Sequence, residues 1–491
     1  IIIVSARMRR LYLMIVCMLV WALPLHAQDR KHEVRAAWIT CAYGLDWPQT
    51  RATNQTTRAR QQAELIALLD ELKAAHFNTV LFQARTRGDV FYRSKIEPFS
   101  AILTGSVGKD PGYDPLAFVV EECHKRGMEC HAWIVALPLG GRKHVTSLGA
   151  RSVVKKQPAI TISYKREYFL DPGHPDTKEY LMKLVREVVK NYDVDGVHFD
   201  YLRYPEHAGT RFPDTRGFRK YGKGRSLAAW RRDNLTDILR HLYKGVKAMK
   251  PWVKVSTSPV GKYDDTSRYS SQGWNAYDAV HQDVVGWMAE GIQDQVYPMM
   301  YFRGNSFYPF ALDWKEQSHG RQVIPGLGIY FLDPSEGDWP IEEIERQIAF
   351  TRQHDIEGQA HYRMAFLSKN VQGLYDKLRY DYYKSPALTP SMPWLDNTPP
   401  THPKDLTIEN KDGYITLRWQ PSTDNDTVNP PRYIVYASDT YPVDISNPEN
   451  ILAAYVPDCS YTYAPLYPWK AKLYYAVTAI DRYGNESIYD L

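Results

Sequence analysis

The stretch Asp195-Gly196-Val197-His198-Phe199-Asp200-Tyr201 is the most informative segment of this 491-residue chain. Its apolar and polar side chains alternate, which predicts a β-strand from Gly196 to Tyr201 with successive side chains on opposite faces. Val197 and Phe199 then face covering helices, and His198 and Asp200 face the interior of a barrel. A carboxylate at the carboxyl end of such a strand is costly to bury without hydrogen bonds or positive charge. Asp200 is therefore predicted to be catalytic rather than a loop-capping carboxylate.

Strand-like and helix-like patterns alternate on both sides of this segment. The predicted strands are 34–40, 79–85, 128–135, 196–201, 253–258, 295–301, 323–329 and 358–362. The predicted helices are 57–76, 115–126, 176–192, 227–250, 277–290, 310–318, 341–354 and 371–382. Eight alternations within residues 33–384 favour an α/β fold of the (β/α)8 TIM-barrel type over an open doubly wound sheet. No glycine-rich phosphate-binding pattern follows any strand, which disfavours a nucleotide enzyme.

The remainder of the chain has a different pattern. Proline and small polar residues in 385–400 predict a linker, and residues 401–491 read as all-β. The stretch Tyr474-Tyr475-Ala476-Val477-Thr478-Ala479, with Gly484-Asn485-Glu486-Ser487 and Trp419, resembles a fibronectin type III domain. The resemblance implies a small immunoglobulin-like sandwich that acts as a spacer or a weak binding module.

The first 27 residues have the pattern of a signal peptide. Arg7, Arg9 and Arg10 precede an apolar run over residues 11–23, and Leu25-His26-Ala27 resembles a cleavage site. We therefore expect an exported protein, in the periplasm or outer envelope of a Gram-negative bacterium, with no membrane span once the signal is removed.

Charge and cysteine usage argue against a nucleic-acid-binding protein and against a metal site. The formal net charge is +5, three of which come from the leader arginines, and no Lys/Arg run suggests a nucleic-acid partner. Cys123-His124 and Cys130-His131 resemble metal ligands, but buried thiols or one local disulfide explain them better. We expect no cofactor, no metal and a monomer.

The alternation seen around Asp200 also identifies candidate binding residues on other strands. Long polar loops follow the third and fourth strands, on the barrel face where such enzymes hold substrate. The candidates are Gln83, Arg85, His131, Trp133, His198, Arg203 and Tyr301. The guanidinium groups offer donors to sugar hydroxyls or to Asp200, and the aromatic rings offer stacking surfaces. A filled barrel layer or a surface ion pair is the alternative for each.

Several motifs in chain order carry a family resemblance. They include Glu33-Val34-Arg35, Leu45-Asp46-Trp47-Pro48, Ser94-Lys95-Ile96-Glu97-Pro98-Phe99-Ser100, Pro111-Gly112-Tyr113-Asp114-Pro115-Leu116, His131-Ala132-Trp133 and Leu170-Asp171-Pro172-Gly173. This pattern resembles the glycosyl-hydrolase-like family 10 barrels. The resemblance implies a hydrolase of bacterial envelopes, with one branch acting on peptidoglycan strands stripped of stem peptides. It implies a catalytic role for Asp200 and adds Arg35 and Asp46 to the substrate-binding candidates. Tyr201 stands where members often carry a second Asp.

Glycoside hydrolysis normally needs two carboxyl groups. The sequence leaves the second unassigned among Asp46, Asp89, Glu129 and Asp264. We therefore expect a glycosidase acting on an N-acetylated glycan, first of all peptidoglycan strands without stem peptides. The alternatives are hydrolysis of another polysaccharide, dietary or capsular, and a carbohydrate-binding barrel without catalytic activity.

Overall fold

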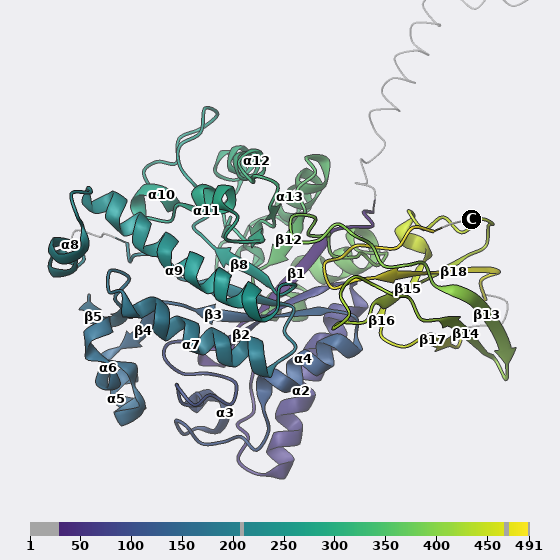
Figure 1. The fold of residues 1–491 in the computed structure, drawn as a ribbon, viewed down its shortest axis with the longest axis horizontal. Helices are drawn as coiled ribbons and strands as arrows, with labels where there is room; N and C mark the ends of the chain where they lie inside the picture. Colours follow the sequence, from purple (N-terminus) through teal and green to yellow (C-terminus); the bar gives the residue numbers. More distant parts are fainter. Residues whose placement is uncertain (1–28, 207–210, 466–470, 490–491) are drawn as a thin grey trace, which may run out of the picture.

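The computed structural model describes residues 29–206, 211–465 and 471–489 (Figure 1). The predicted signal peptide lies outside the described residues. Within them, no helix combines the length and apolar character needed to cross a bilayer.

A parallel β-sheet curls into a barrel and forms the centre of the larger part of the protein. Its strands are β1 (Val34–Ile39), β2 (Thr79–Arg85), β3 (Glu129–Val135), β7 (Gly196–Asp200), β8 (Lys254–Ser258), β9 (Gln295–Val296), β10 (Gln322–Val323), β11 (Gly326–Leu327) and β12 (Gly358–His361). They run in the order β10-β9-β8-β7-β3-β2-β1-β12-β11.

The seventh predicted strand closes the barrel. It is divided into β10, which pairs with β9, and β11, which pairs with β12. Between them, the Ile324 amide donates to the Val296 carbonyl at 2.8 Å, and the Ala360 amide donates to the Pro325 carbonyl at 3.0 Å. These bonds join the two ends of the sheet, and the (β/α)8 barrel prediction is confirmed.

Helices cover the outside of the barrel (Figure 1). They are α2 (Gln55–Ala74), α4 (Pro115–Lys125), α7 (Asp176–Asn191), α9 (Leu227–Met249), α10 (Ala276–Ala279), α11 (Val284–Glu290), α12 (Tyr308–Glu316), α13 (Ile341–Gln353), α14 (Met364–Ser368) and α15 (Leu374–Lys377). The helix predicted over 277–290 is two helices, because the side chains of Asn275 and Asp283 each cap a separate start. The last predicted helix is a series of short turns.

The faces predicted for the strand around Asp200 are confirmed. Val197 and Phe199 belong to the apolar core between strands and helices. A separate cluster fills the barrel interior and includes Trp38, Leu81, Trp133, Val135 and Tyr297.

The predicted long loop between β3 and α7 contains secondary structure of its own. The strands β4 (Pro138–Gly141), β5 (Thr161–Tyr164) and β6 (Glu167–Leu170) form an antiparallel sheet in the order β4-β6-β5. The helices α5 (Arg142–Leu148) and α6 (Val153–Lys156) accompany it. This insertion lies at the end of the barrel away from the C-terminal strands (Figure 1).

Two small antiparallel sheets form the C-terminal part. One is β13 (Lys404–Lys411), β14 (Tyr414–Gln420) and β17 (Ser460–Tyr463), in the order β13-β14-β17. The other is β15 (Arg432–Ser438), β16 (Ile451–Val456) and β18 (Tyr474–Ile480), in the order β16-β15-β18. Trp419, Tyr433 and Val477 share one buried core, so the predicted small all-β unit is confirmed. Its fibronectin type III character stays a prediction.

Residues 385–400 are fixed against the barrel. Leu388 and Met392 are fully buried, and the Leu388 amide donates to the Lys31 carbonyl at 2.7 Å. The Met392 amide donates to the Tyr483 carbonyl at 2.8 Å, and Gln322 Nε2 donates to the Ser391 carbonyl at 2.9 Å. The segment therefore connects the two parts without forming a free spacer.

Charged groups join the C-terminal sheets to the amino ends of the barrel strands. Asp195 accepts hydrogen bonds from His124 Nε2 at 2.8 Å and from the Cys130 amide at 2.9 Å. Arg482, in the C-terminal part, donates to Asp193 at 2.7 Å and lies 3.9 Å from Asp195. The charges of His124 and Arg482 hold the pKa of Asp195 well below its ordinary value, against the effect of burial. Arg482 thus links the C-terminal part to two carboxylates at the amino end of the barrel.

We expect Arg482→Ala to lower the free energy of unfolding by about 1–3 kcal/mol, because it leaves a buried carboxylate short of a partner. Arg418→Ala is the control, since Arg418 pairs with Glu409 on the exposed surface of the same sheets. That change is expected to cost less than about 0.5 kcal/mol. Urea unfolding of both variants measures the difference, and equal effects would show that the junction charges do not stabilise the protein.

Candidate active site

A cleft of about 600 Å³ opens at the carboxyl ends of the barrel strands. Asp200 lies in it, together with four of the binding residues predicted from sequence. Those four are Gln83, Trp133, Arg203 and Tyr301. Loops after β1, β2 and β7 and the insertion after β3 supply the walls. The cleft is thus built where barrel enzymes hold their substrates.

Asp200 is 5% exposed and is held by three hydrogen-bond donors. Trp133 Nε1 donates to Oδ2 at 3.1 Å. Ser258 Oγ and the Tyr201 amide donate to Oδ1 at 3.0 and 2.8 Å. Burial raises the pKa of Asp200, while the Arg203 charge and these three donors act in the opposite direction. The result is a fixed carboxyl group that keeps its proton to higher pH than an ordinary Asp.

Aromatic and amide groups surround this carboxyl. Tyr301 stacks on Tyr362 with a ring separation of 5.3 Å and an interplanar angle of 23°. Gln83 Oε1 accepts from the Cys41 and Ala42 amides at 3.0 and 2.8 Å, which fixes the loop after β1. The predicted positions of Gln83 and Tyr301 in the cleft are therefore matched by the structure.

Arg203 lies just after β7 and beside Tyr201. Its guanidinium carbon is 4.7 Å from the centre of the Tyr201 ring, and Nη1 is 3.8 Å from Glu206 Oε1. Tyr201 has a positive φ of 51° and its ring is 42% exposed. The backbone thus turns sharply after Asp200 and presents an aromatic ring to the cleft.

Two predicted binding residues lie deeper in the barrel, outside the cleft lining. His198 is fully buried, with Nδ1 2.9 Å from Ser256 Oγ, and Trp38 Nε1 donates to its Nε2 at 3.4 Å. Burial lowers the pKa of His198 well below its ordinary value, so the ring is neutral. His131 is also fully buried, beside Glu129 at 3.0 Å, at the amino end of β3. Both face the interior as predicted, but one or two layers below the cleft.

Arg35 is at the opposite end of the barrel from the cleft. It is the second residue of β1, where interior positions are taken by Val34, Ala36 and Trp38. Its side chain therefore points outward, pairs with Glu33 at 2.8 Å and lies 4.5 Å from the Tyr383 ring centre. The prediction that Arg35 binds substrate is not matched by this position.

Arg85 is diverted by an irregularity in β2. The pairing with β3 shifts between Gln83 and Arg85, so Arg85 aligns with Ile134, whose side chain faces the helices. Arg85 is fully buried and binds both oxygens of Glu97 at 2.7 Å. It stabilises the scaffold behind the cleft and does not line it.

Asp46 connects two loops instead of lining the cleft. Its Oδ2 accepts from the Thr40 amide at 2.7 Å, and its Oδ1 accepts from the Ala365 amide at 2.8 Å and from Arg363 at 2.5 Å. Burial raises the pKa of Asp46, and the Arg363 charge opposes that shift. Both carboxylate oxygens of Asp46 thus accept hydrogen bonds from the protein itself.

The cleft also contains residues that the sequence reading did not select. Besides Tyr201 and Tyr362 these include Tyr43, Leu45, Arg87, Glu167, Phe169, Glu206 and Ser258. Most lie in loops or in the insertion, where strand alternation gives no information. The length of the insertion after β3 was the one available signal for Glu167 and Phe169.

Glu167 and Glu206 are the carboxylates that line the cleft with Asp200, among the residues the structure describes. The four positions considered from sequence are elsewhere or engaged. Asp89 accepts from the Arg87 amide at 3.1 Å, Asp264 accepts from Asn275 at 3.1 Å, and Glu129 pairs with Lys254 at the amino end of the barrel. None of them lines the cleft.

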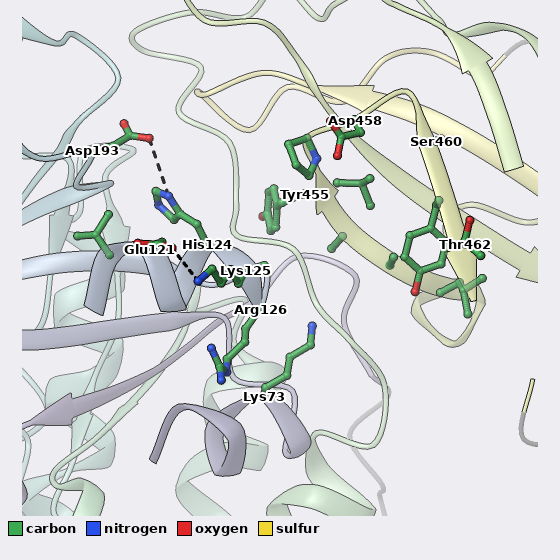
Figure 2. Close-up of a pocket in the computed structure, with 18 of the residues that line it drawn as sticks. Lys73, Glu121, His124, Lys125, Arg126, Asp193, Tyr455, Asp458, Ser460 and Thr462 are labelled. Carbon is green, nitrogen blue, oxygen red and sulfur yellow. Dashed lines mark ion pairs between the residues drawn. The ribbon is translucent and has the colours of Figure 1, made fainter. Parts of the chain in front are cut away.

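A second cleft, of about 880 Å³, lies between the ends of α2, α4 and α7 and the strands β16 and β17 with the turn that joins them (Figure 2). Although it is larger, it is at the amino end of the barrel, away from Asp200. Some of its charged groups lie close to one another: Lys125 is 2.7 Å from Glu121, and His124 is 3.8 Å from Asp193 (Figure 2). By volume alone this cleft would be the candidate active site. The buried carboxyl group of Asp200 identifies the other cleft as the candidate instead.

Neither cleft is built as a metal site. Within the described residues, no group of three or more His, Cys, Asp or Glu side chains is arranged to hold an ion. Cys123 and Cys130 are buried free thiols.

Comparison with known proteins identifies the reaction class. The family described as Glycosyl hydrolase-like 10 matches residues 33–331, which include β1 and Asp200. The chain belongs to this family. It is similar to Glycosyl hydrolase YngK of Bacillus subtilis (strain 168), 34% identical over 428 residues that cover 83% of each chain. It is also similar to Glycosyl hydrolase DigH of Escherichia coli (strain K12), 33% identical over 379 residues that cover 70% of this chain and 86% of DigH.

A solved structure supports the fold. The PgaB (BpsB) glycoside hydrolase domain from Bordetella bronchiseptica has a TM-score of 0.51 and 15% identity, over 73% of this chain and 100% of that chain. At this identity the likeness concerns the fold alone. Family membership, the named relatives and a buried carboxyl in a barrel cleft together confirm the prediction of a glycoside hydrolase.

We expect Ser258→Ala to move the limb of the pH–rate profile that Asp200 controls toward higher pH. The Ser258 hydroxyl favours the ionised form of Asp200, so its removal raises the pKa of the carboxyl further. The direction is the same whether Asp200 acts as acid or base. The measurement is kcat/KM against pH for both proteins, and an unmoved or acid-shifted limb would rule out control by Asp200.

Proposed function

We propose that this protein is an exported glycosidase that cleaves N-acetylated glycan, specifically peptidoglycan strands without stem peptides, with Asp200 as its central acid/base. The observation that carries the proposal is Asp200 itself: buried in the cleft, fixed by three donors and with a raised pKa. A carboxyl group in this condition keeps its proton to higher pH than an ordinary Asp and can donate it to the leaving glycosidic oxygen.

The surroundings of Asp200 suit both of its protonation states. In the protonated state the carboxyl can donate to the leaving oxygen. After transfer, the carboxylate is stabilised by Trp133, Ser258 and the Tyr201 amide, and by the charge of Arg203. The group can then accept a proton from water. Such a site allows one carboxyl to act first as acid and then as base.

We infer that Glu167 or Glu206 supplies the second carboxyl group of the reaction. Glu167 is on β6 of the insertion, and Glu206 follows β7 and is 3.8 Å from Arg203. In an inverting enzyme the second carboxylate activates water, and in a retaining enzyme it attacks the sugar. Replacing the acting residue by Gln is expected to reduce kcat by about 10²–10⁴-fold, and replacing the other one by much less.

The character of the cleft supports a glycan of modest charge. Among the residues that the structure describes, its lining mixes carboxylates with two guanidinium groups, those of Arg87 and Arg203, and has no basic stripe. Tyr43, Tyr301 and Trp133 supply flat faces and polar edges of the kind that bind sugar rings. The predicted export signal supports an envelope polymer as substrate. We also infer a fibronectin type III-like fold for residues 401–491, consistent with its two three-stranded sheets.

The first test is Asp200→Asn. We expect turnover to fall by at least about 10²-fold while glycan binding persists, because Asn keeps the shape of Asp but cannot transfer its proton. Asp439→Asn is the control, since Asp439 pairs with Lys472 on the surface of the C-terminal sheets and lies outside the cleft. Hydrolysis and binding are measured on the same glycan preparation. A loss of only two- to threefold in the Asp200 variant would assign catalysis to another residue.

The substrate test compares sacculi with and without stem peptides. The protein is expected to release soluble fragments faster from amidase-treated sacculi than from untreated ones, because a cleft of about 600 Å³ gives little room for peptide branches. Fragment release is followed by chromatography. Degradation of a neutral glucan in place of both would retain the hydrolase and reject the peptidoglycan assignment. Binding without any cleavage would favour a carbohydrate-binding barrel.

A further inference from the structure

Four of the five exposed large apolar side chains that the structure describes in the barrel lie at one end of it. In the described part of residues 33–384 the five are Tyr43, Leu45, Tyr201, Trp274 and Tyr380. Tyr43, Leu45 and Tyr201 line the cleft around Asp200. Trp274 is 38% exposed on the loop that follows β8, so it belongs to the same end of the barrel although it is outside the cleft lining. Exposed aromatic rings that gather in this way mark a binding surface.

The strand order places two of these rings on opposite sides of the barrel. Tyr43 follows β1 and Trp274 follows β8, and the order β1-β2-β3-β7-β8 separates their strands by four positions in a ring of eight. Asp200 ends β7, within this interval, and its carboxyl reaches β8 through Ser258. A line from Tyr43 to Trp274 therefore crosses the face that contains Asp200.

The rings of Tyr43 and Trp274 each pack against another side chain. The guanidinium of Arg87 lies 4.4 Å from the centre of the Tyr43 ring. Trp274 packs edge-to-face against Phe302, with a ring separation of 6.0 Å and an interplanar angle of 74°. Phe302 directly follows Tyr301, which lines the cleft. The platform at Trp274 is thus continuous with the wall of the cleft.

The loop that carries Trp274 is held by its own polar contacts. Asn275 Nδ2 donates to Asp264 at 3.1 Å and to Ser271 Oγ at 3.3 Å, and the Ser271 amide donates to Asp265 at 2.6 Å. The Trp274 ring is consequently presented in a fixed position, which reduces the entropy lost when a ligand stacks on it.

We propose that a glycan chain lies across this face from Tyr43 to Trp274, with sugar rings stacked on both tyrosine and tryptophan at outer subsites. A chain bound on both sides of Asp200 is cut internally, so the enzyme is endo-acting on polymers and its efficiency rises with chain length. The inference rests on the proposed function for its substrate, and it adds Trp274, outside the cleft lining, to the ring of Tyr43 within it.

Binding in an inactive background tests the outer subsite directly. The proteins are Asp200→Asn, Asp200→Asn/Trp274→Ala and Asp200→Asn/Tyr380→Ala, and the probe is soluble peptide-free glycan strands in affinity electrophoresis. Tyr380 is the matched control, because it is 66% exposed in the turn Leu378–Tyr382, whose last carbonyl binds Arg352 beside Glu33 at the amino end of the barrel. Loss of Trp274 is expected to weaken binding about tenfold, and loss of Tyr380 less than about twofold. Equal retardation of all three proteins would overturn the proposal.

Product size tests the mode of cleavage in the active enzyme. Fragments of intermediate length are expected before the shortest products accumulate, and Trp274→Ala is expected to lower kcat/KM on long strands about tenfold while leaving the shortest cleaved oligosaccharide within about twofold. Release of terminal sugars from the outset, or an equal loss on all lengths, would overturn it. If the wild-type protein cleaves no glycan, the proposed function fails, and the binding comparison still decides whether Trp274 forms a subsite.

Discussion

The hydrogen bonds that Trp133 and Ser258 donate to Asp200 depend on the register of three adjacent parallel strands. Asp200 aligns with Ser258 on one side and with Val135 on the other, two residues beyond Trp133. A shift of one residue in either pairing would turn a donor away from the barrel interior and leave the buried carboxyl without compensation. The helices, the closed ring and the apolar layer around Val197 and Phe199 all serve to maintain that register. The chemical site and the stability of the scaffold are for this reason coupled.

The two ends of the barrel use charge differently. At the amino end, Glu33, Asp195 and Glu129 are paired with cations that hold each carboxyl pKa below its ordinary value, to about 2 for Glu33 and Glu129. At the carboxyl end, burial raises the pKa of Asp200 instead. Ionised pairs suit a permanent junction, because they contribute stability above the pKa of the unfolded carboxyls and lose it only as the pH falls toward 2. A carboxyl group with a raised pKa, such as that of Asp200, suits proton transfer.

Sequence reasoning reached the barrel and the centre of its site, because both follow from periodic patterns. The alternation around Asp200 is correct, and Trp133 and Tyr301 lie in the cleft by the same argument. Arg85 could not be placed, since a register shift in β2 leaves no mark in an otherwise regular strand. His131 and His198 face the barrel interior as predicted, but they lie below the cleft. Alternation predicts which face of a strand carries a side chain and does not predict how deep in the barrel it lies. Glu167 comes from an inserted sheet whose position depends entirely on tertiary contacts.

The pairing of the first and last barrel strands also bears on how the chain acquires its structure. Val34 aligns with Gly358, and Ala37 with His361. The pairing of β1 with β12 therefore cannot form until residues more than three hundred positions later in the chain have been synthesised. Until these emerge, β1 has a free edge and the barrel remains an open sheet. Contacts of such long sequence separation form slowly, and an open sheet edge is prone to pair with other chains. During synthesis, the nascent chain therefore has a long interval in which an accessory factor that covers exposed strand edges would protect it from aggregation.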